Sequence, residues 1–234
     1  MSKHISIVLI ALVVCILVVA IWTENGLRSE KTGNDSIKQA QTPPPAAQQE
    51  KRKWDIEVPD FTIIDKSPEN EKIVGSQYQN TKYKFRFTVP DGWDYFPPGA
   101  AHTIVKVGQK RMGISMIVSV FPYDNPNLKH YQHTQQEMDD HLSVVRPAMR
   151  SQNIEPTKVE LEKSFLYNYP AYTTWVEYMN KGAGMEIEYI SLTTQCVMYG
   201  GLYNIIIMLP KQLWTEEMAN RVMNSINSFR FDFY

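Results

Sequence analysis

Three histidines and a glutamate form the group of side chains best suited to chemistry in this sequence. They are His130, His133, Glu137 and His141, spaced three, four and four residues apart. On a helix this spacing places them on one flank, and zinc accepts imidazole and carboxylate ligands. However, the order differs from the H-E-x-x-H motif of zinc hydrolases. Because an amphipathic helix also carries a polar border beside its apolar stripe, we expect such a border here, without a metal.

Other arrangements that support catalysis are weak or absent. The sequence has no G-x-S-x-G motif, and residues 182–184 lack the third glycine and following helix of a dinucleotide-binding loop. Asp139 and Asp140 are neighbours on a predicted helix and point apart. Glu186 and Glu188 would share one face of a strand, where paired carboxylates can do acid–base work, but a solvated sheet face is the simpler account. We therefore expect no catalytic residue, no cofactor and no enzyme activity.

Aromatic side chains offer a candidate surface for binding a partner. The chain contains 13 tyrosines, which interfaces favour, although strand propensity and core packing also account for them. The segment 93–99 places three aromatics among prolines in a predicted loop, where function concentrates. Within this loop we predict that Tyr95 and Phe96 contact a partner.

The two cysteines lie in different parts of the chain. Cys15 falls inside an apolar N-terminal run, where it serves as a small apolar residue. Cys196 has no second cysteine in its domain, so an internal disulfide is excluded. Because its neighbours Val197 and Met198 are apolar, a buried structural thiol is favoured over a thiol that pairs between chains.

The elements that would position these residues are strands interrupted by two helices. Alternation or β-branched and aromatic content predicts strands at residues 82–89, 104–107, 113–120, 158–163, 171–179, 185–194, 202–209 and 229–233. Helical spacing of apolar residues predicts a helix over 131–149, with Leu142 in its apolar stripe, and Thr215 caps a second helix. Short turns between strands imply an antiparallel sheet, and the helices must cover its faces. The predicted fold class is α+β.

A run of eighteen uncharged, mostly apolar residues from Ile5 to Trp22 predicts a single transmembrane helix. At about 1.5 Å per residue it spans about 27 Å, close to the hydrocarbon thickness of a bilayer. A cleaved signal would have a shorter core and a small-residue cleavage site. A lipoprotein signal would need a small residue before Cys15, where Val14 stands. We therefore expect an uncleaved anchor at residues 5–22, with the N-terminus in the cytoplasm.

Composition divides the rest of the chain into a linker and a domain. Residues 23–77 form a predicted polar linker, rich in proline and glutamine and unable to build a core. Residues 78–234 form one predicted domain, large enough for its own core. This domain carries 15 basic and 15 acidic residues, so it lacks the basic excess of a nucleic-acid-binding surface.

Several short motifs in the predicted domain resemble those of the PsbP/DcrB-like superfamily. A strand of alternating aromatics ends in Pro90-x-x-Trp93, Tyr169–Ala171 and Gly200–Tyr203 lead into strands, and Ser225–Phe229 closes the second helix. The resemblance covers about residues 78–234, and it implies an α/β/α sandwich in which Trp93 packs in the core. It also implies an accessory role through binding other proteins, with no shared catalytic residues to carry over. An N-terminal anchor departs from the plant members and favours a bacterial envelope.

Taken together, these features predict a membrane-anchored extracytoplasmic accessory domain that binds another envelope protein and is not a catalyst. The anchor, the polar linker and the neutral domain favour a single-pass protein of the inner membrane with a periplasmic C-terminal domain. A small-ligand-binding or sensing domain is the alternative, and a large apolar cavity would favour it. An enzyme is the third hypothesis, and it would require a cleft that brings ionisable groups together.

Overall fold

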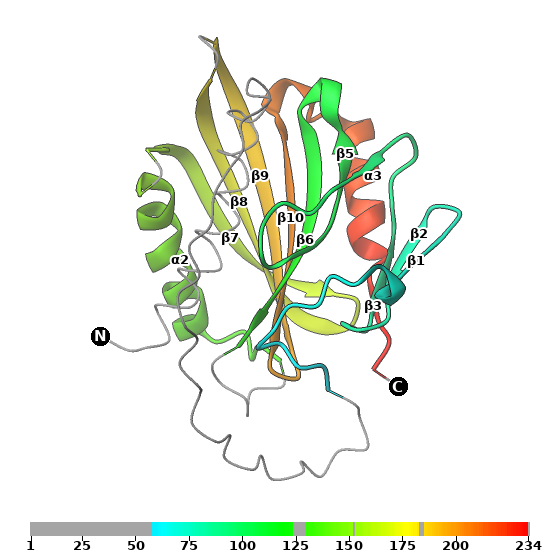
Figure 1. Cartoon of the computed structure of the whole chain (residues 1–234). Helices are drawn as coiled ribbons and strands as arrows, with labels where there is room; N and C mark the ends of the chain where they lie inside the picture. Colours follow the sequence, from blue (N-terminus) through cyan, green and yellow to red (C-terminus); the bar gives the residue numbers. More distant parts are fainter. Residues whose placement is uncertain (1–57, 124–129, 152, 183–184, 234) are drawn as a thin grey trace, which may run out of the picture.

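The computed structural model describes residues 58–123, 130–151, 153–182 and 185–233 (Figure 1). In chain order the elements are η1 (Pro68–Asn70), β1 (Glu71–Val74), β2 (Gln77–Asn80), β3 (Phe85–Thr88), β4 (Asp94–Phe96), β5 (Thr103–Gln109), η2 (Lys110–Met112), β6 (Ile114–Pro122), α2 (Gln135–Arg150), β7 (Pro156–Leu166), β8 (Tyr169–Gly182), β9 (Met185–Met198), β10 (Gly201–Pro210), η3 (Lys211–Leu213), α3 (Glu216–Asn227) and β11 (Arg230–Phe231).

The strands build two antiparallel sheets. The large sheet has the order β4-β5-β6-β10-β9-β8-β7, and the small sheet has the order β1-β2-β3-β11. Short turns join β5 to β6, β7 to β8, and β9 to β10, and such turns require antiparallel neighbours; β8 and β9 are also paired antiparallel. The prediction of an antiparallel α+β fold is confirmed. The predicted first and last strands, however, pair with each other in the separate small sheet.

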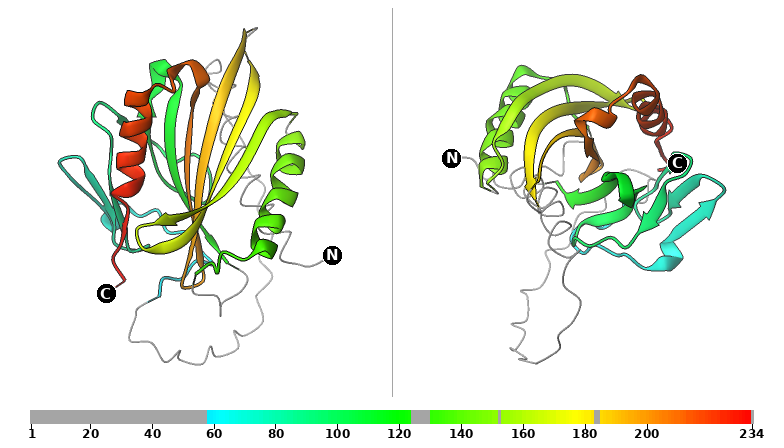
Figure 2. Two further views of the ribbon diagram at one scale, coloured as in Figure 1. Left: turned by 180° about the vertical axis from the view of Figure 1, so that it is seen from behind. Right: turned by 90° about the horizontal axis from the view of Figure 1, so that it is seen from above.

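The two helices cover opposite faces of the large sheet (Figure 2). Val145 and Met149 of α2 pack with Val176 and Tyr178 of β8. The buried side of α3, which includes Val222, joins the main core together with the small sheet. The sandwich therefore has α2 on one face, and α3 with the small sheet on the other.

Each helix begins where the sequence provides a cap. Thr215 accepts a hydrogen bond from the backbone N–H of Met218 at the start of α3, as its position before two glutamates predicts. Thr134 and Glu137 form a reciprocal capping box at the start of α2. This cap starts α2 at residue 135, so Tyr131 of the predicted helix lies before its first turn.

Aromatic rings form the centre of the main core. Phe229 stacks on Phe85 at 5.2 Å and on Phe87 at 5.9 Å between ring centroids. The alternation of residues 82–89 produces this arrangement, because it turns every second side chain toward the large sheet. Trp93 is also buried, as predicted.

The folded part begins earlier than the predicted boundary between linker and domain. That boundary, at residue 78, falls within the hairpin of β1 and β2. Upstream of it, Phe61 is buried against Tyr83 and Tyr203, at 6.0 Å from each ring. Pro59 and Pro68 interrupt this segment, so it lacks the periodicity by which a core segment is recognised.

The predicted membrane anchor at residues 5–22 lies outside the described part of the chain. Among the residues that the structure describes, no helix has the length and apolarity needed to cross a bilayer.

Candidate functional site

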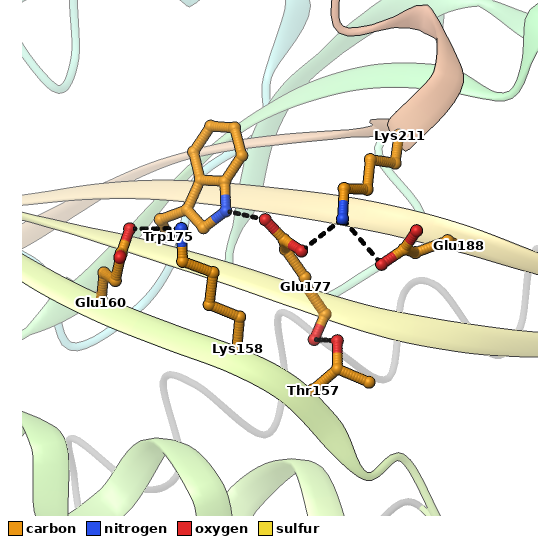
Figure 3. Close-up of polar contacts among 7 residues, drawn as sticks. All are labelled: Thr157, Lys158, Glu160, Trp175, Glu177, Glu188 and Lys211. Atoms are coloured by element: carbon orange, nitrogen blue, oxygen red, sulfur yellow. Dashed lines mark hydrogen bonds and ion pairs between the residues drawn. The ribbon is translucent and has the colours of Figure 1, made fainter.

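A group of interacting charged side chains lies where β8 and β9 meet η3 (Figure 3). Lys211 donates hydrogen bonds from Nζ to Glu177 Oε2 at 2.6 Å and to Glu188 Oε1 at 2.9 Å. On the other side of Glu177, the indole N–H of Trp175 donates to Oε1 at 3.0 Å. Trp214 packs edge-on against Trp175, at 5.1 Å between centroids. The sheet register brings these residues together from three different elements.

The one cation of this cluster is shared between two carboxylates. Hydrogen bonding from Lys211 lowers the pKa of Glu177, and the two carboxylates raise the pKa of Lys211. A carboxylate held ionised beside an ammonium held protonated is a poor acid–base pair near neutral pH. The adjoining surface depression, of about 360 Å³, is lined by Glu186, Ile187, Glu188, Lys211 and Gln212. Four of these five residues carry charged or amide groups, unlike the lining of the apolar cavity expected of a small-ligand-binding domain.

The structure does not place His130, His133, Glu137 and His141 together on one flank of a helix. His130 and His133 precede α2, and His133 donates from Nε2 to the Ala171 carbonyl at 2.8 Å. Glu137 is occupied by the capping box. The described residues contain no group of three or more histidine, cysteine, aspartate or glutamate side chains placed to hold a metal ion.

His141 instead joins a buried polar network between α2 and the large sheet. Its Nδ1 donates to the Glu137 carbonyl at 2.8 Å, and Nε2 lies 3.4 Å from the Tyr131 hydroxyl. The hydroxyl of Tyr172 donates to Glu137 Oε2 at 2.9 Å, and Gln195 lies against His141. Burial lowers the pKa of His141, because the charged imidazolium loses water there. The network joins α2 to the sheet through hydrogen bonds.

The two predicted partner-contacting residues lie on β4 rather than in a loop. Tyr95 is 39% exposed, whereas Phe96 is half-buried. Successive residues of a strand point to opposite faces, so Tyr95 and Phe96 do not share one surface. Sequence reasoning assigned these residues to a loop because Pro97 and Pro98 follow them directly.

Tyr95 lies beside the β1–β2 hairpin, and β1 carries exposed apolar side chains that sequence reasoning missed. Its ring is 6.3 Å from that of Tyr78, and Ile73 is the register partner of Tyr78 across the β1–β2 pair. Ile73 is 52% exposed and Val74 is 74% exposed. We call Ile73 and Tyr95 the edge surface, because β1 and β4 are the end strands of their sheets. Val74 follows Ile73 directly in β1 and therefore points to the opposite face of that strand. The available sequence signal was a β-branched pair just before Gly75, inside the predicted linker.

Cys196 and most tyrosines serve the interior. Cys196 is fully buried, as predicted, and burial raises the pKa of its thiol. Tyr78, Tyr83, Tyr131, Tyr172 and Tyr203 are among the largest fully buried side chains. Core packing thus accounts for these tyrosines, and it leaves few aromatics for a binding surface.

Comparison with known proteins places this architecture in the class of PsbP-like α+β folds. No family model matches the sequence, and no curated protein sequence matches it. The solution structure of cyanobacterial PsbP (CyanoP) from Synechocystis sp. PCC 6803 is similar, with a TM-score of 0.50 and 15% identity. The alignment covers 68% of this chain and 94% of that chain. This likeness establishes the fold alone.

Two further solved structures are more distant. A crystal structure from Bacteroides thetaiotaomicron VPI-5482 has a TM-score of 0.45 and 12% identity, over 68% of this chain. The match spans about half (49%) of the Bacteroides chain. LpqN of Mycobacterium tuberculosis, described as involved in cell envelope biogenesis, has a TM-score of 0.38 and 12% identity over 63% of this chain and 83% of its own.

Proposed function

We propose that this protein is a membrane-anchored extracytoplasmic accessory protein whose folded domain binds another envelope protein without catalysing a reaction. Residues 5–22 supply the anchor, and the C-terminal domain lies on the outer side of the inner membrane. The apolar N-terminal run supports the anchor. The cluster around Lys211, in which opposite charges are mutually paired, supports a structural role for the ionisable groups.

The edge surface carries the proposal for protein binding. Exposed apolar side chains scattered singly are ordinary, but Ile73 and Tyr95 both lie where the small sheet meets the large one, since Tyr95 packs near Tyr78, the register partner of Ile73. Tyrosine is enriched at interfaces, because its ring contributes contact area and its hydroxyl a hydrogen bond. End strands also carry backbone groups that a partner can pair with. A partner segment would therefore meet apolar side chains and strand backbone in one place.

Site-specific photo-crosslinking in intact cells tests this proposal. A photoreactive phenylalanine derivative would replace Tyr95 in the full-length protein, and a second variant would carry it at Met112. Met112 is similarly exposed, at 44%, but lies in the η2 turn between β5 and β6. We expect one protein to crosslink from position 95 and not from position 112.

A substitution on β1 provides the specificity control. Ile73→Lys should reduce the crosslink from position 95 about tenfold, which corresponds to losing about 1.4 kcal/mol of binding energy. Because Ile73 is half-exposed, the thermal midpoint should stay close to that of the wild type. Equal crosslinking from positions 95 and 112, or a yield unaffected by Ile73→Lys, would reject the edge surface as the binding site.

A further inference from the structure

A second exposed aromatic group lies at the turn between β7 and β8. Phe165, near the end of β7, is 62% exposed, and Tyr167, in the turn, is 45% exposed. The backbone of Tyr167 has φ +59°, a left-handed conformation that is uncommon for bulky residues. Such a conformation persists where the surrounding structure holds it, and it is a reason to look for function.

Neighbouring side chains hold the turn in place. The Arg230 guanidinium lies over the Tyr167 ring, 4.6 Å from its centroid, and donates to the carbonyls of Asn227 and Phe229 at 2.7 Å each. On the other side, His133 packs edge-on against Phe165, at 5.3 Å between ring centroids. The exposed rings are thus presented on a supported turn with a cation beside them.

The N-terminal segment enters the domain at this same end. The turn after β7 and the turn between β9 and β10 lie at one end of the large sheet, since Ala171 pairs with Cys196. The Phe61 ring lies against Gly201, the first residue of β10. Figure 1 shows the start of the described chain, the β9–β10 turn and the C-terminus at the lower end of the molecule.

We propose that the β7–β8 turn, through Phe165, Tyr167 and Arg230, docks on the surface of the lipid bilayer. Tyrosine and phenylalanine place an apolar ring at the headgroup boundary, and a guanidinium attracts lipid phosphate. This inference rests on the proposed anchor at residues 5–22. Thirty-five residues, 23–57, separate that anchor from Val58, so the anchor by itself leaves the orientation of the domain open.

Because the anchor already holds the chain at the membrane, a small docking surface is sufficient to orient the domain against the bilayer. Once one part of a chain is held at a membrane, a second contact forms intramolecularly, at an effective concentration on the order of millimolar. Two aromatic rings and one cation would bind a membrane weakly on their own. Docking would place the domain with its N-terminal entry toward the lipid and the β5–β6 and β8–β9 turns away from it.

Fluorescence quenching by brominated lipid tests the proposal in the full-length protein. The protein would carry Cys15→Ser, which leaves the buried Cys196 as its native thiol. A thiol-reactive NBD probe can then be attached at position 165 through Phe165→Cys. Met112→Cys provides the control position. Each labelled protein would be reconstituted into vesicles of phosphatidylcholine and phosphatidylglycerol. We expect the probe at position 165 to shift its emission to shorter wavelength and to be quenched by brominated lipid, and the probe at position 112 to do neither.

Flotation of the same vesicles separates the failure of docking from the failure of anchoring. If the protein floats with the vesicles but the probe at position 165 is quenched no more than the probe at 112, docking is wrong and the anchor stands. If the protein does not float, the anchor and the docking that rests on it are both wrong. Arg230→Gln, made with the probe at position 165, should weaken quenching and leave flotation unchanged.

Discussion

At the scale of single residues, the imidazole of His141 makes stability depend on pH. His141 is buried between α2 and the sheet, where Tyr131, Tyr172, Gln195 and Glu137 surround it. Its Nδ1 must donate to the Glu137 carbonyl, so the neutral ring keeps Nε2 as an acceptor for the Tyr131 hydroxyl. Protonation of Nε2 would remove this acceptor and bury a charge.

The sign of the effect follows from the lowered pKa of His141. The unfolded chain binds a proton at about pH 6.5, whereas the folded protein binds it only at lower pH. The contribution of neutral His141 to the free energy of unfolding is therefore fully present above about pH 6.5. This contribution declines as the pH falls toward the pKa of His141 in the folded protein. The opposing attraction of Glu137 for the imidazolium is smaller than the loss of hydration.

We expect His141→Gln to flatten the pH dependence of unfolding between about pH 7 and pH 5. Urea unfolding at several pH values would measure it. His102 also has a pKa lowered by burial, so His102→Gln should remove a separate part of the dependence of the free energy of unfolding on pH. The double variant should show the weakest dependence on pH. If His141→Gln keeps the wild-type slope, the imidazole is not the group that titrates.

At the scale of elements, the contact between Phe61 and Gly201 attaches the N-terminal segment to β10. A Cβ atom built on Gly201 would overlap the Phe61 ring, so Gly201→Ala forces the ring or the strand to shift. Overpacking of this kind costs about 1–3 kcal/mol. Phe61→Ala removes a buried aromatic ring and should cost about 3 kcal/mol or more.

A double-mutant cycle measures this contact directly. If the Phe61 ring causes the cost of Gly201→Ala, that cost should largely disappear in the Phe61→Ala background. Denaturant midpoints of the four proteins would give the coupling energy. Additive effects would mean that the alanine at position 201 acts on β10 itself and that the N-terminal segment is attached elsewhere.

The same elements show which features can be predicted from sequence. Alternation located β3, and β-branched content located β8, β9 and β10, because each signal is local. The apolar stripe located α2, yet His141 is buried where Leu142 was expected, and Leu142 is 41% exposed. A buried histidine depends on partners from β8 and β9 that lie far away in the sequence. The Lys211 cluster and the β1 part of the edge surface were missed for the same reason, since both arise from contacts between elements that are separate in the sequence.

At the scale of the whole molecule, the two proposed binding surfaces lie in different regions of one scaffold. The edge surface lies where the β1–β2 hairpin of the small sheet meets β4 of the large sheet. The β7–β8 turn lies at the end where the N-terminal segment enters. A domain docked through this turn could still present the edge surface to a partner, because β4 and β7 are opposite end strands of the large sheet.

The extent of the folded unit can be tested by truncation. Residues 58–77 contribute Phe61, strand β1 and the backbone N–H of Asp65, which donates to the Tyr83 hydroxyl at 2.7 Å. A chain of residues 78–234 lacks all three. The loss of the Phe61 ring alone should lower the free energy of unfolding by about 3 kcal/mol, and a typical domain has roughly 5–15 kcal/mol. We therefore expect residues 58–234 to unfold cooperatively in urea and residues 78–234 to unfold at a clearly lower midpoint. Equal midpoints would place the start of the stable domain at residue 78, and would make the packing of Phe61 energetically unimportant.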